Sequence, residues 1–437
     1  MKKRLAGKPV YIVDGVRTPF MKARPVPGHW SAADLAVQAG HALLLRQPFE
    51  PSQIQEVIMG CVMPAVDEAN IARIAALRLG CGDDVPAWTV QRNCASGMQA
   101  IDSAAQSIAS GRADLVLAGG TEAMSRGPLL FSDEAVSWFG QLSSAKSRLE
   151  YIKMMSRFRP RFLKPVIGLL KGLSDPVCGL SMGQTAEKLA FMFNISRQEM
   201  DAYAVRSHHR LADAYDEARF SQELTCLLDP LDGKVYSEDD GLRRNTSVQA
   251  LAGLRPVFDK KYGKVTAGNS SQVSDGACFL VLAGEKTVKE YHLPVLGRLC
   301  DIQWAALSPD QMGLGPVHAA TPLLLRQRLN LDDIDYWEIN EAFAAQVLAC
   351  FAAWKDRDYC KDKLKLEKAF GELHEERVNV DGGAISLGHP VGASGARIVL
   401  HLLHVLKQRK GKRGAAAICI GGGQGGALLV ENTEGEK

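Results

Sequence analysis

The chain has 437 residues, of which 46% are hydrophobic and 23% are charged, and its formal net charge is +3. A chain of this length can bury a large core in two domains or two related halves, and this balance excludes a disordered or nucleic-acid-binding protein. Its ten cysteines include no C-x-x-C pair, which argues against a zinc site or a redox dithiol and favours a reducing compartment, the cytoplasm. The basic start has no apolar stretch of signal-peptide length, and no apolar run reaches about 18 residues, so we expect neither a secretory signal nor a membrane-spanning helix.

Predicted strands and helices alternate in both parts of the chain, which indicates an α/β fold. In the first part the pattern predicts strands at 9–16, 54–62, 87–93 and 113–120 and helices at 31–45, 70–80 and 95–111. In the second part it predicts strands at 334–340, 377–383 and 415–423 and helices at 317–330, 341–354 and 392–410.

Two of these units resemble each other. The stretches that begin at Cys94 and at Gly392 both run from a small residue through Ala-Ser-Gly, a helix, a basic turn and a buried strand to Gly-Gly. Such self-similarity predicts two related α/β halves whose strand ends meet at a ligand site. We expect the first half at residues 1–124 and 261–285, a mainly helical inserted domain at 125–260, and the second half at 286–437.

The inserted segment lacks the strand–helix rhythm, and part of it is strongly basic. Residues 146–171 carry eight Lys and Arg against one acid. Apolar residues recur there with helical spacing, at Leu149, Ile152 and Met155. The segment is either a solvated helical lid packed on the core or a surface for a membrane or a partner protein. The stretch 195–220 predicts a charged amphipathic helix pair in the same lid.

Near the end of the chain, Gly421, Gly423 and Gly426 form a literal G-x-G-x-x-G. A dinucleotide-binding turn needs a helix after it and an acid about 20 residues further on. A short strand follows here, so the pattern favours a strand–turn–strand unit. Cys419 lies beside that turn, where backbone N–H groups freed by glycine, that of Gly421 among them, could point at an oxyanion.

Three further residues are candidates for chemistry. Cys94 follows a predicted strand and precedes a helix, whose positive end favours the nucleophilic thiolate, although a buried structural cysteine is the alternative. His389 lies in a glycine-rich loop before Pro390 and is either the base for that thiol or a hydrogen-bonded loop histidine. Asn340 ends a predicted strand and could donate toward developing negative charge or cap the next helix.

Six ordered motifs, spread over nearly the whole chain, resemble the thiolase family. They are NCASGMQA from Asn93, AGGTEAMS at 118–125, TAGNSSQVSDGA at 266–277, NEAFA at 340–344, GGAISLGHPVGASGAR at 382–397 and CIGGGQG at 419–425. The resemblance implies the thiolase fold, which has two duplicated βαβαβαββ halves in a five-layered α/β/α/β/α core and a loop domain inserted in the first half.

The same resemblance implies a role for each candidate. Cys94 looks like the nucleophile that accepts the acyl group, and His389 looks like its base. Cys419 looks like the acid that protonates the leaving enolate and then deprotonates incoming CoA. His389 and a water held by Asn340 resemble a first oxyanion hole, and the N–H groups of Cys94 and Gly421 resemble a second.

The resemblance further predicts the substrates. Ser271, Phe258 and Met182 match positions that line the CoA and acyl pocket, where the family often has His in place of Ser181. CoA is expected as a substrate, and neither a metal nor a permanently bound cofactor is expected. The predicted reaction is thiolytic cleavage of 3-ketoacyl-CoA to acetyl-CoA and a shortened acyl-CoA in fatty-acid β-oxidation. The alternative is an acetyl-CoA C-acetyltransferase that condenses two acetyl-CoA, a reading that Asn340 keeps open because many β subunits of fatty-acid oxidation complexes have His there.

Other classes fit the motifs less well. A decarboxylating ketoacyl synthase shares the fold but has no counterpart of Cys419, and a non-catalytic lipid-binding module would lack Cys94 or His389. Expected partners are 3-ketoacyl-CoA, acetyl-CoA, CoA and further copies of the chain in a homodimer or dimer of dimers. The basic segment 146–171 adds a hydratase/dehydrogenase α subunit or a membrane surface as a partner, and no nucleic acid is expected.

Overall fold

The structure is a computed structural model that describes residues 5–24 and 26–433. The first half alternates strands and helices as the sequence predicts: β1 (Val10–Arg17), β2 (Met21–Lys22), α1 (Ala32–Leu44), β3 (Glu56–Gly60), α2 (Ile71–Arg78), β4 (Ala87–Val90), α3 (Ser96–Ala109), β5 (Leu115–Ala123) and, after a long insertion, β10 (Ser274–Gly284). Short 3-10 turns lie between them and further along the chain: η1 (Pro51–Gln53), η2 (Val66–Glu68), η3 (Met124–Arg126), η5 (Pro309–Leu314), η6 (Leu331–Asp333) and η7 (Glu375–Arg377).

The second half follows after α10 (Glu285–Glu290) and repeats this alternation. Its elements are β11 (Gly297–Ala306), α11 (Gly315–Gln327), β12 (Tyr336–Ile339), α12 (Ala344–Lys355), α13 (Arg357–Leu364), α14 (Ala384–Leu387), α15 (Val391–Gln408), β13 (Arg413–Ile420) and β14 (Gln424–Glu431).

The two halves share one strand order. In the first half the order is β1–β10–β5–β3–β4, and in the second it is β11–β14–β13–β12. The outer pairs β3–β5 and β12–β13 are parallel, whereas β10 and β14 are antiparallel to both of their neighbours. Pairing of β1 with β11 at Val10–Ile12 joins the halves into one continuous sheet. The duplication predicted from the Ala-Ser-Gly units is therefore visible in the topology.

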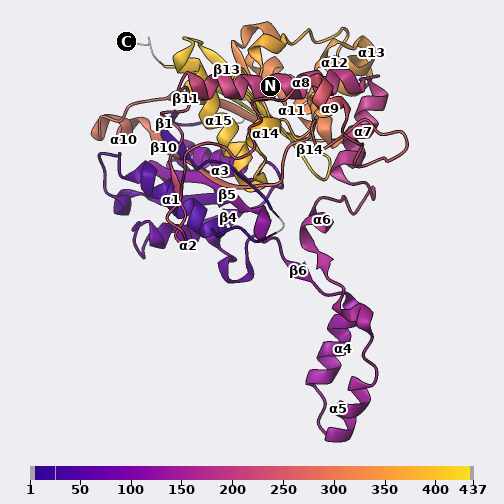
Figure 1. The fold of residues 1–437 in the computed structure, drawn as a ribbon. Coiled ribbons are helices and arrows are strands. Elements are labelled where there is room, and N and C mark those ends of the chain that lie inside the picture. Colours follow the sequence, from indigo (N-terminus) through magenta and orange to yellow (C-terminus); the bar gives the residue numbers. More distant parts are fainter. Residues whose placement is uncertain (1–4, 25, 434–437) are drawn as a thin grey trace.

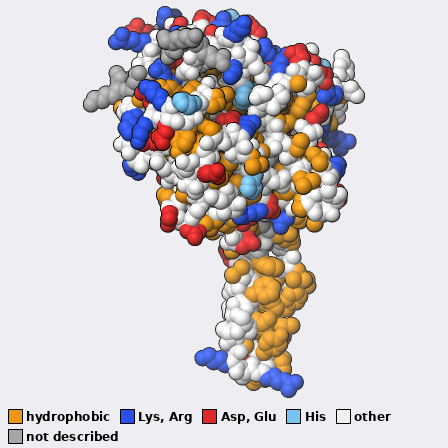
Figure 2. Space-filling model, turned by 90° about the vertical axis from the view of Figure 1, so that its left-hand side faces the viewer, with side chains coloured by type: hydrophobic (Ala, Val, Ile, Leu, Met, Phe, Trp, Pro, Cys, Tyr) orange, Lys and Arg blue, Asp and Glu red, His pale blue; other side chains and the backbone are white. Residues whose placement is uncertain are grey.

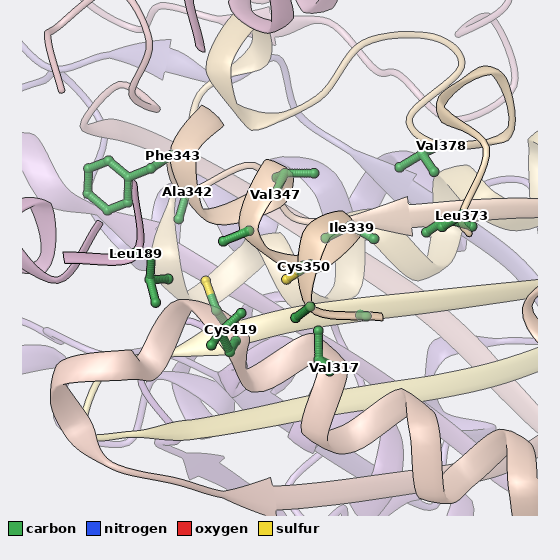
Figure 3. Packing of buried hydrophobic residues seen from close by; sticks show 14 of the residues in the cluster. Leu189, Val317, Ile339, Ala342, Phe343, Val347, Cys350, Leu373, Val378 and Cys419 are labelled. Atoms are coloured by element: carbon green, nitrogen blue, oxygen red, sulfur yellow. The ribbon is translucent and has the colours of Figure 1, made fainter. Parts of the chain in front are cut away.

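Three hydrophobic cores separate the layers. One lies between the first half-sheet and α1 and α2, and a second packs α3 and α15 between the two half-sheets. The third lies between the second half-sheet and α11 and α12, and Figure 3 shows side chains of β13 and α12 meeting in it. Burial of this apolar surface is the main favourable term for folding. The arrangement confirms the predicted five-layered α/β/α/β/α core.

The shared Ala-Ser-Gly units have a packing reason. Their glycines, Gly97 of α3 and Gly395 of α15, lie where the two central helices touch. A Cβ at Gly97 would lie 2.8 Å from Gly392 O, and one at Gly395 would lie 2.6 Å from Met98 N. A side chain at either position would push the two helices apart, and with them the residues that precede each helix.

The inserted segment contains a projecting arm, which we define as residues 129–167. It is formed by β6 (Leu129–Leu130), α4 (Asp133–Ser143), α5 (Arg148–Met155), η4 (Pro160–Leu163) and β7 (Val166–Ile167). The arm extends away from the body of the molecule (Figure 1), and α5 has no buried residue. The interpretation of this stretch as a lid packed on the core is therefore wrong. A small core of Ala135, Trp138 and Phe162 stabilises the arm.

The rest of the insertion packs on the body. Its elements are α6 (Gly168–Gly172), α7 (Met182–Met192), α8 (Arg197–Asp216), β8 (Leu227–Leu228), β9 (Val235–Tyr236) and α9 (Val248–Ala252). The helix pair predicted at 195–220 is the single 20-residue helix α8, whose start has a capping box between Ser196 and Glu199. None of the helices in the described part of the chain is long and apolar enough to cross a membrane.

Candidate active site

Cys94 lies in the turn between β4 and α3, at the mouth of a cavity. Its neighbour Asn93 has φ 44°, and the Asn93 side-chain amide donates to Gly421 O at 2.8 Å. That bond joins the turn of the first half to the glycine turn of the second half. A cavity of about 360 Å³ is lined by Cys94, His389 and Cys419 together. The structure therefore brings the three predicted chemical groups to one place.

The ionisation of Cys94 differs from the sequence-based expectation. Burial raises the pKa of the Cys94 thiol above its ordinary value, while hydrogen bonds from the backbone of Gly421 and of Cys94 itself lower it. Burial outweighs these hydrogen bonds, so the pKa of Cys94 moves in the direction opposite to the predicted preference for thiolate. The two amides nevertheless converge on the sulfur, where they would meet an oxygen on any carbon bonded to it.

Cys419 is 1% exposed and lies next to the last residue of β13. Burial raises the pKa of its thiol well above the ordinary value, and the nearby Cys94 and Cys350 raise it further. Cys419 is therefore a thiol at neutral pH and a proton donor. The turn that follows contains Gly422 and Gly423 with φ of 88° and 74°, and leads directly into the antiparallel strand β14. The strand–turn–strand prediction is confirmed.

His389 is buried, and its hydrogen bonds fix its tautomer. The Ser394 hydroxyl donates to Pro390 O at 2.9 Å, so it accepts from His389 Nδ1 at 2.7 Å. Nδ1 therefore bears the proton, and the lone pair of Nε2 faces the Asn340 side-chain amide. Burial, assisted by the Arg397 guanidinium, lowers the pKa of His389 to about 4. The imidazole is neutral at physiological pH and can accept a proton at Nε2.

Asn340 lies behind His389 and is fully buried after β12. Its Nδ2 is 3.4 Å from His389 Nε2, and its Oδ1 has no hydrogen-bond partner in the described part of the chain. An unpaired buried carbonyl oxygen is costly unless something such as a water donates to it. The helix-cap alternative is wrong because α12 begins at Ala344 and its N-cap residue is Phe343.

Glu341 anchors this loop, a role that the sequence did not indicate. Its carboxylate accepts from Tyr203 Oη at 3.0 Å and Ser207 Oγ at 2.7 Å, both on α8. It also accepts from Asn379 Nδ2 at 2.9 Å and from Ile385 N at 3.2 Å. The loop that presents Asn340 is thus tied to the inserted segment and to the stretch that leads to His389.

The predicted pocket residues also reach the cavity. Ser271, Phe258 and Met182 line the same space of about 360 Å³ as Cys94. Ser271 Oγ donates to Ala342 O at 3.0 Å, and the Phe258 ring meets Phe343 edge-on. Ser181 caps α7, the helix that Met182 begins.

A second cavity of about 530 Å³ adjoins the first, with Cys94 and Met182 in both. It is lined by Met63, by Leu169 of α6 and by Gly421 and Gly422 of the glycine turn. The sulfur of Cys94 therefore lies where two spaces meet. No group of three or more His, Cys, Asp or Glu within 5–24 and 26–433 could bind a metal ion.

Comparison with known proteins agrees with this geometry. The family model of the thiolase N-terminal domain matches residues 10–286, and that of the thiolase C-terminal domain matches residues 293–432. The chain belongs to the thiolase family. It is 36% identical over 427 residues to a 3-ketoacyl-CoA thiolase of Serratia proteamaculans, and the match covers 97% of both chains.

Solved structures confirm the thiolase fold. The acetyl-CoA acetyltransferase of Bacillus anthracis superposes with a TM-score of 0.83 at 36% identity, covering 98% of this thiolase and 99% of that chain. Human mitochondrial 3-ketoacyl-CoA thiolase in complex with CoA superposes with a TM-score of 0.81 at 35% identity, covering 98% of each chain.

Proposed function

We propose that this thiolase cleaves 3-ketoacyl-CoA with CoA, releasing acetyl-CoA and an acyl-CoA that is two carbons shorter, through an acyl group on Cys94. The observation that carries the proposal is the shared cavity of Cys94, His389 and Cys419, with a neutral imidazole whose Nε2 is unprotonated. Relatives named 3-ketoacyl-CoA thiolase support it, and the CoA in the similar human structure supports CoA as a substrate.

In the first half-reaction, His389 Nε2 takes the Cys94 proton as the sulfur attacks the keto carbon. The new oxyanion lies on the carbon bonded to sulfur, within reach of the Cys94 and Gly421 amides. Cleavage of the C2–C3 bond then leaves the electron pair on acetyl-CoA as an enolate. His389, now protonated, and Asn340 with its bound water stabilise the enolate oxygen, and each such donor contributes about 3 kcal/mol.

Cys419 completes the reaction by donating a proton to the enolate and then accepting one from CoA. Its thiol protonates C2 of the enolate, and acetyl-CoA leaves. The resulting Cys419 thiolate takes the proton of incoming CoA, whose sulfur attacks the acyl group on Cys94. The Cys94 sulfur then leaves as thiolate and regains its proton from His389. Ser271, Phe258 and Met182 line the cavity from which CoA would enter.

The experiment offers the purified protein 3-ketobutyryl-, 3-ketooctanoyl- and 3-ketohexadecanoyl-CoA, each with CoA. We expect acetyl-CoA and the shortened acyl-CoA from the longer substrates, and an acyl adduct on Cys94 by mass spectrometry when CoA is omitted. Absence of an adduct on Cys94 would contradict the proposal.

A second candidate function is the condensation of two acetyl-CoA by an acetyl-CoA C-acetyltransferase. The similarity to the Bacillus anthracis acetyltransferase supports it, as does Asn340 in the NEAFA motif. Turnover restricted to 3-ketobutyryl-CoA would favour this function over the first.

We propose a homodimer or dimer of dimers. The edge strand β4 supports this, because its outer side lacks a neighbouring strand in the described sheet and Trp88 is 39% exposed on it. An open edge strand is a template for pairing with a second chain. Light scattering coupled to size-exclusion chromatography measures the mass, and a monomer would contradict the proposal.

We also propose that the arm binds an anionic membrane surface, with a hydratase/dehydrogenase α subunit as the alternative partner. Apolar side chains run along one side of the arm, and Lys and Arg lie at its far end (Figure 2). Leu149, Ile152 and Leu163 are each more than half exposed. Each basic residue near an anionic leaflet contributes about 1 kcal/mol. The ten unpaired cysteines support a cytoplasmic location.

The arm is tested with vesicles that contain an anionic phospholipid. Arg157→Gln, Arg159→Gln and Arg161→Gln combined should abolish cosedimentation without changing turnover. The matched control replaces three exposed lysines of the second half by Gln, Lys361, Lys363 and Lys365, and it should sediment like the native protein. Absence of vesicle binding by the native protein, or unchanged binding in the arm variant, would contradict membrane binding through the arm, and capture of an added α subunit by the arm would then favour the alternative.

A further inference from the structure

Glu122, at the end of β5, is a fully buried carboxylate that the reaction above does not use. Its oxygens accept hydrogen bonds from Val62 N at 2.9 Å and Met63 N at 3.0 Å, in the loop after β3. The Cys61 thiol donates to the same carboxylate at 3.6 Å. Met63 lines the larger cavity, so these bonds fix one wall of the site.

A further bond reaches the other half of the molecule. The backbone of Gly392, in the first turn of α15, also donates to the Glu122 carboxylate. The N-cap residue of α15, Pro390, provides no side-chain hydrogen bond, so a carboxylate from the opposite half-sheet takes that place. The contact is close, because a Cβ at Gly392 would lie 2.9 Å from Glu122 Oε2. Helix α15 begins two residues after His389, whose imidazole it positions through Ser394.

The charge of Glu122 acts on the nucleophile. Its negative charge raises the pKa of Cys94 and of Cys61, in addition to the effect of burial. Burial raises the pKa of Glu122 itself to about 7, against the hydrogen bonds that favour its charged form. The hydrogen-bond partners of Glu122 within 5–24 and 26–433 are amides and a thiol, and none is a cation. The other titratable groups that line a cavity together with Cys94 are His389 and Cys419 in the smaller one and Lys171 and Asp175 in the larger one.

We propose that Glu122 is a positioning residue that fixes the start of α15, and through it His389, against the loop after β3. Its negative charge adds to burial in disfavouring the Cys94 thiolate, an effect that the charge-neutral variant tests separately. The role rests on the proposed function of Cys94 as the nucleophile.

Two variants separate charge from position. Glu122→Gln keeps the shape and removes the charge, and Glu122→Asp keeps the charge and withdraws it by one methylene. The rate of Cys94 alkylation by iodoacetamide is measured against pH, with the site identified by peptide mass spectrometry, alongside kcat and KM. The control, Asp301→Asn, neutralises a buried carboxylate of β11 that binds Arg326 and Gln327 instead.

For Glu122→Gln the midpoint of the pH dependence of Cys94 alkylation should fall by about half to one pH unit, so that the alkylation rate near pH 7 rises about three- to tenfold. Both Glu122 variants should lose about tenfold or more in kcat with little change in KM. Asp no longer reaches the same amides, and Gln offers them one acceptor oxygen instead of two, so the position of His389 changes in each. Glu122→Asp should keep the native midpoint, and Asp301→Asn should lose stability without moving it.

The inference is overturned if Glu122→Gln leaves the midpoint in place, or if either variant keeps native kcat. If the Gln variant does not fold, a native kcat in Glu122→Asp overturns it alone. A native protein that shows no thiolysis and no acyl adduct would instead refute the proposed function, which distinguishes the two failures.

Discussion

Replacing Cys419 by Ala separates the two half-reactions. The change removes the only proton donor assigned to the enolate, and positioned general acids contribute about 10²–10⁴-fold. Thiolysis should therefore fall by at least about 100-fold. Acylation of Cys94 from an acyl donor should persist, because His389 and the Gly421 amide are untouched.

The structural cost of this change follows from the core. Cys419 packs with Leu189, Ala342 and Cys350 (Figure 3), and loss of one buried heavy atom there costs about 1 kcal/mol. Cys350→Ala is a matched control, because Cys350 is equally buried in the same cluster and does not line the cavity. Its thiol donates to Gly313 O at 3.4 Å, so its stability loss should be at least as large.

The assay combines steady-state thiolysis, single-turnover acylation followed by mass spectrometry, and urea unfolding. We expect Cys419→Ala to acylate without completing turnover, and Cys350→Ala to lose stability with native turnover. Thiolysis within threefold of native in Cys419→Ala would refute the assigned role, and equal loss in both variants would show that packing rather than proton transfer is responsible.

The remaining predictions concern the histidines His389 and His401. His389→Gln should slow alkylation of Cys94 near neutral pH by about tenfold and turnover by about 10²–10⁴-fold, because the base is lost. Since the pKa of His389 is lowered to about 4, its unprotonated form is available as a base above that pH, so kcat/KM should stay constant down to about pH 5 and fall as pH passes through 4. The same lowered pKa reduces the free energy of unfolding as pH falls from about 6.5 to 4, because in that range only the unfolded chain binds the proton. His401, 2.9 Å from Glu223 Oε2, has a pKa raised to about 10, so its stabilisation is complete below about pH 6.5 and disappears as pH rises through 10. His401→Gln should therefore lower the free energy of unfolding in urea by about 3–5 kcal/mol near pH 7, and the difference between native protein and variant should narrow toward pH 10. A difference that does not change with pH would contradict the raised pKa of His401.

The features predicted correctly from sequence are those that short stretches specify. Cys94, His389 and Cys419 each lie at a strand end or a helix start, and strand ends of duplicated α/β halves meet at a site. Their convergence could therefore be predicted without coordinates. The same reasoning separated the glycine turn from a dinucleotide-binding motif, because the decisive feature was the strand that follows Gly426.

The features that were missed depend on tertiary contacts. The helix-terminus argument predicted a thiolate at Cys94, but burial, which no local pattern reports, outweighs it. The strand predicted at 377–383 is only a pair of isolated bridges, because Asn379 has φ 48° and uses its side chain on Ile339 and Glu341. Helical spacing at Leu149 and Ile152 predicted α5 without indicating that it would project into solvent. No sequence pattern indicated the role of Glu122, because its hydrogen-bond partners lie in two segments far from it in the chain, 61–63 and Gly392.

The glycine turn that completes the site is synthesised long after the turn that carries Cys94. The Gly421 amide, the Cys419 thiol and the partner of the Asn93 side chain all belong to the hairpin of β13 and β14. Translation proceeds from the N-terminus, and early domains can fold before later ones exist. On a nascent chain that lacks the second half, Cys94 thus has neither the Gly421 amide nor the Cys419 thiol beside it. The proposed acyl transfer to Cys94 therefore requires that both halves have folded together.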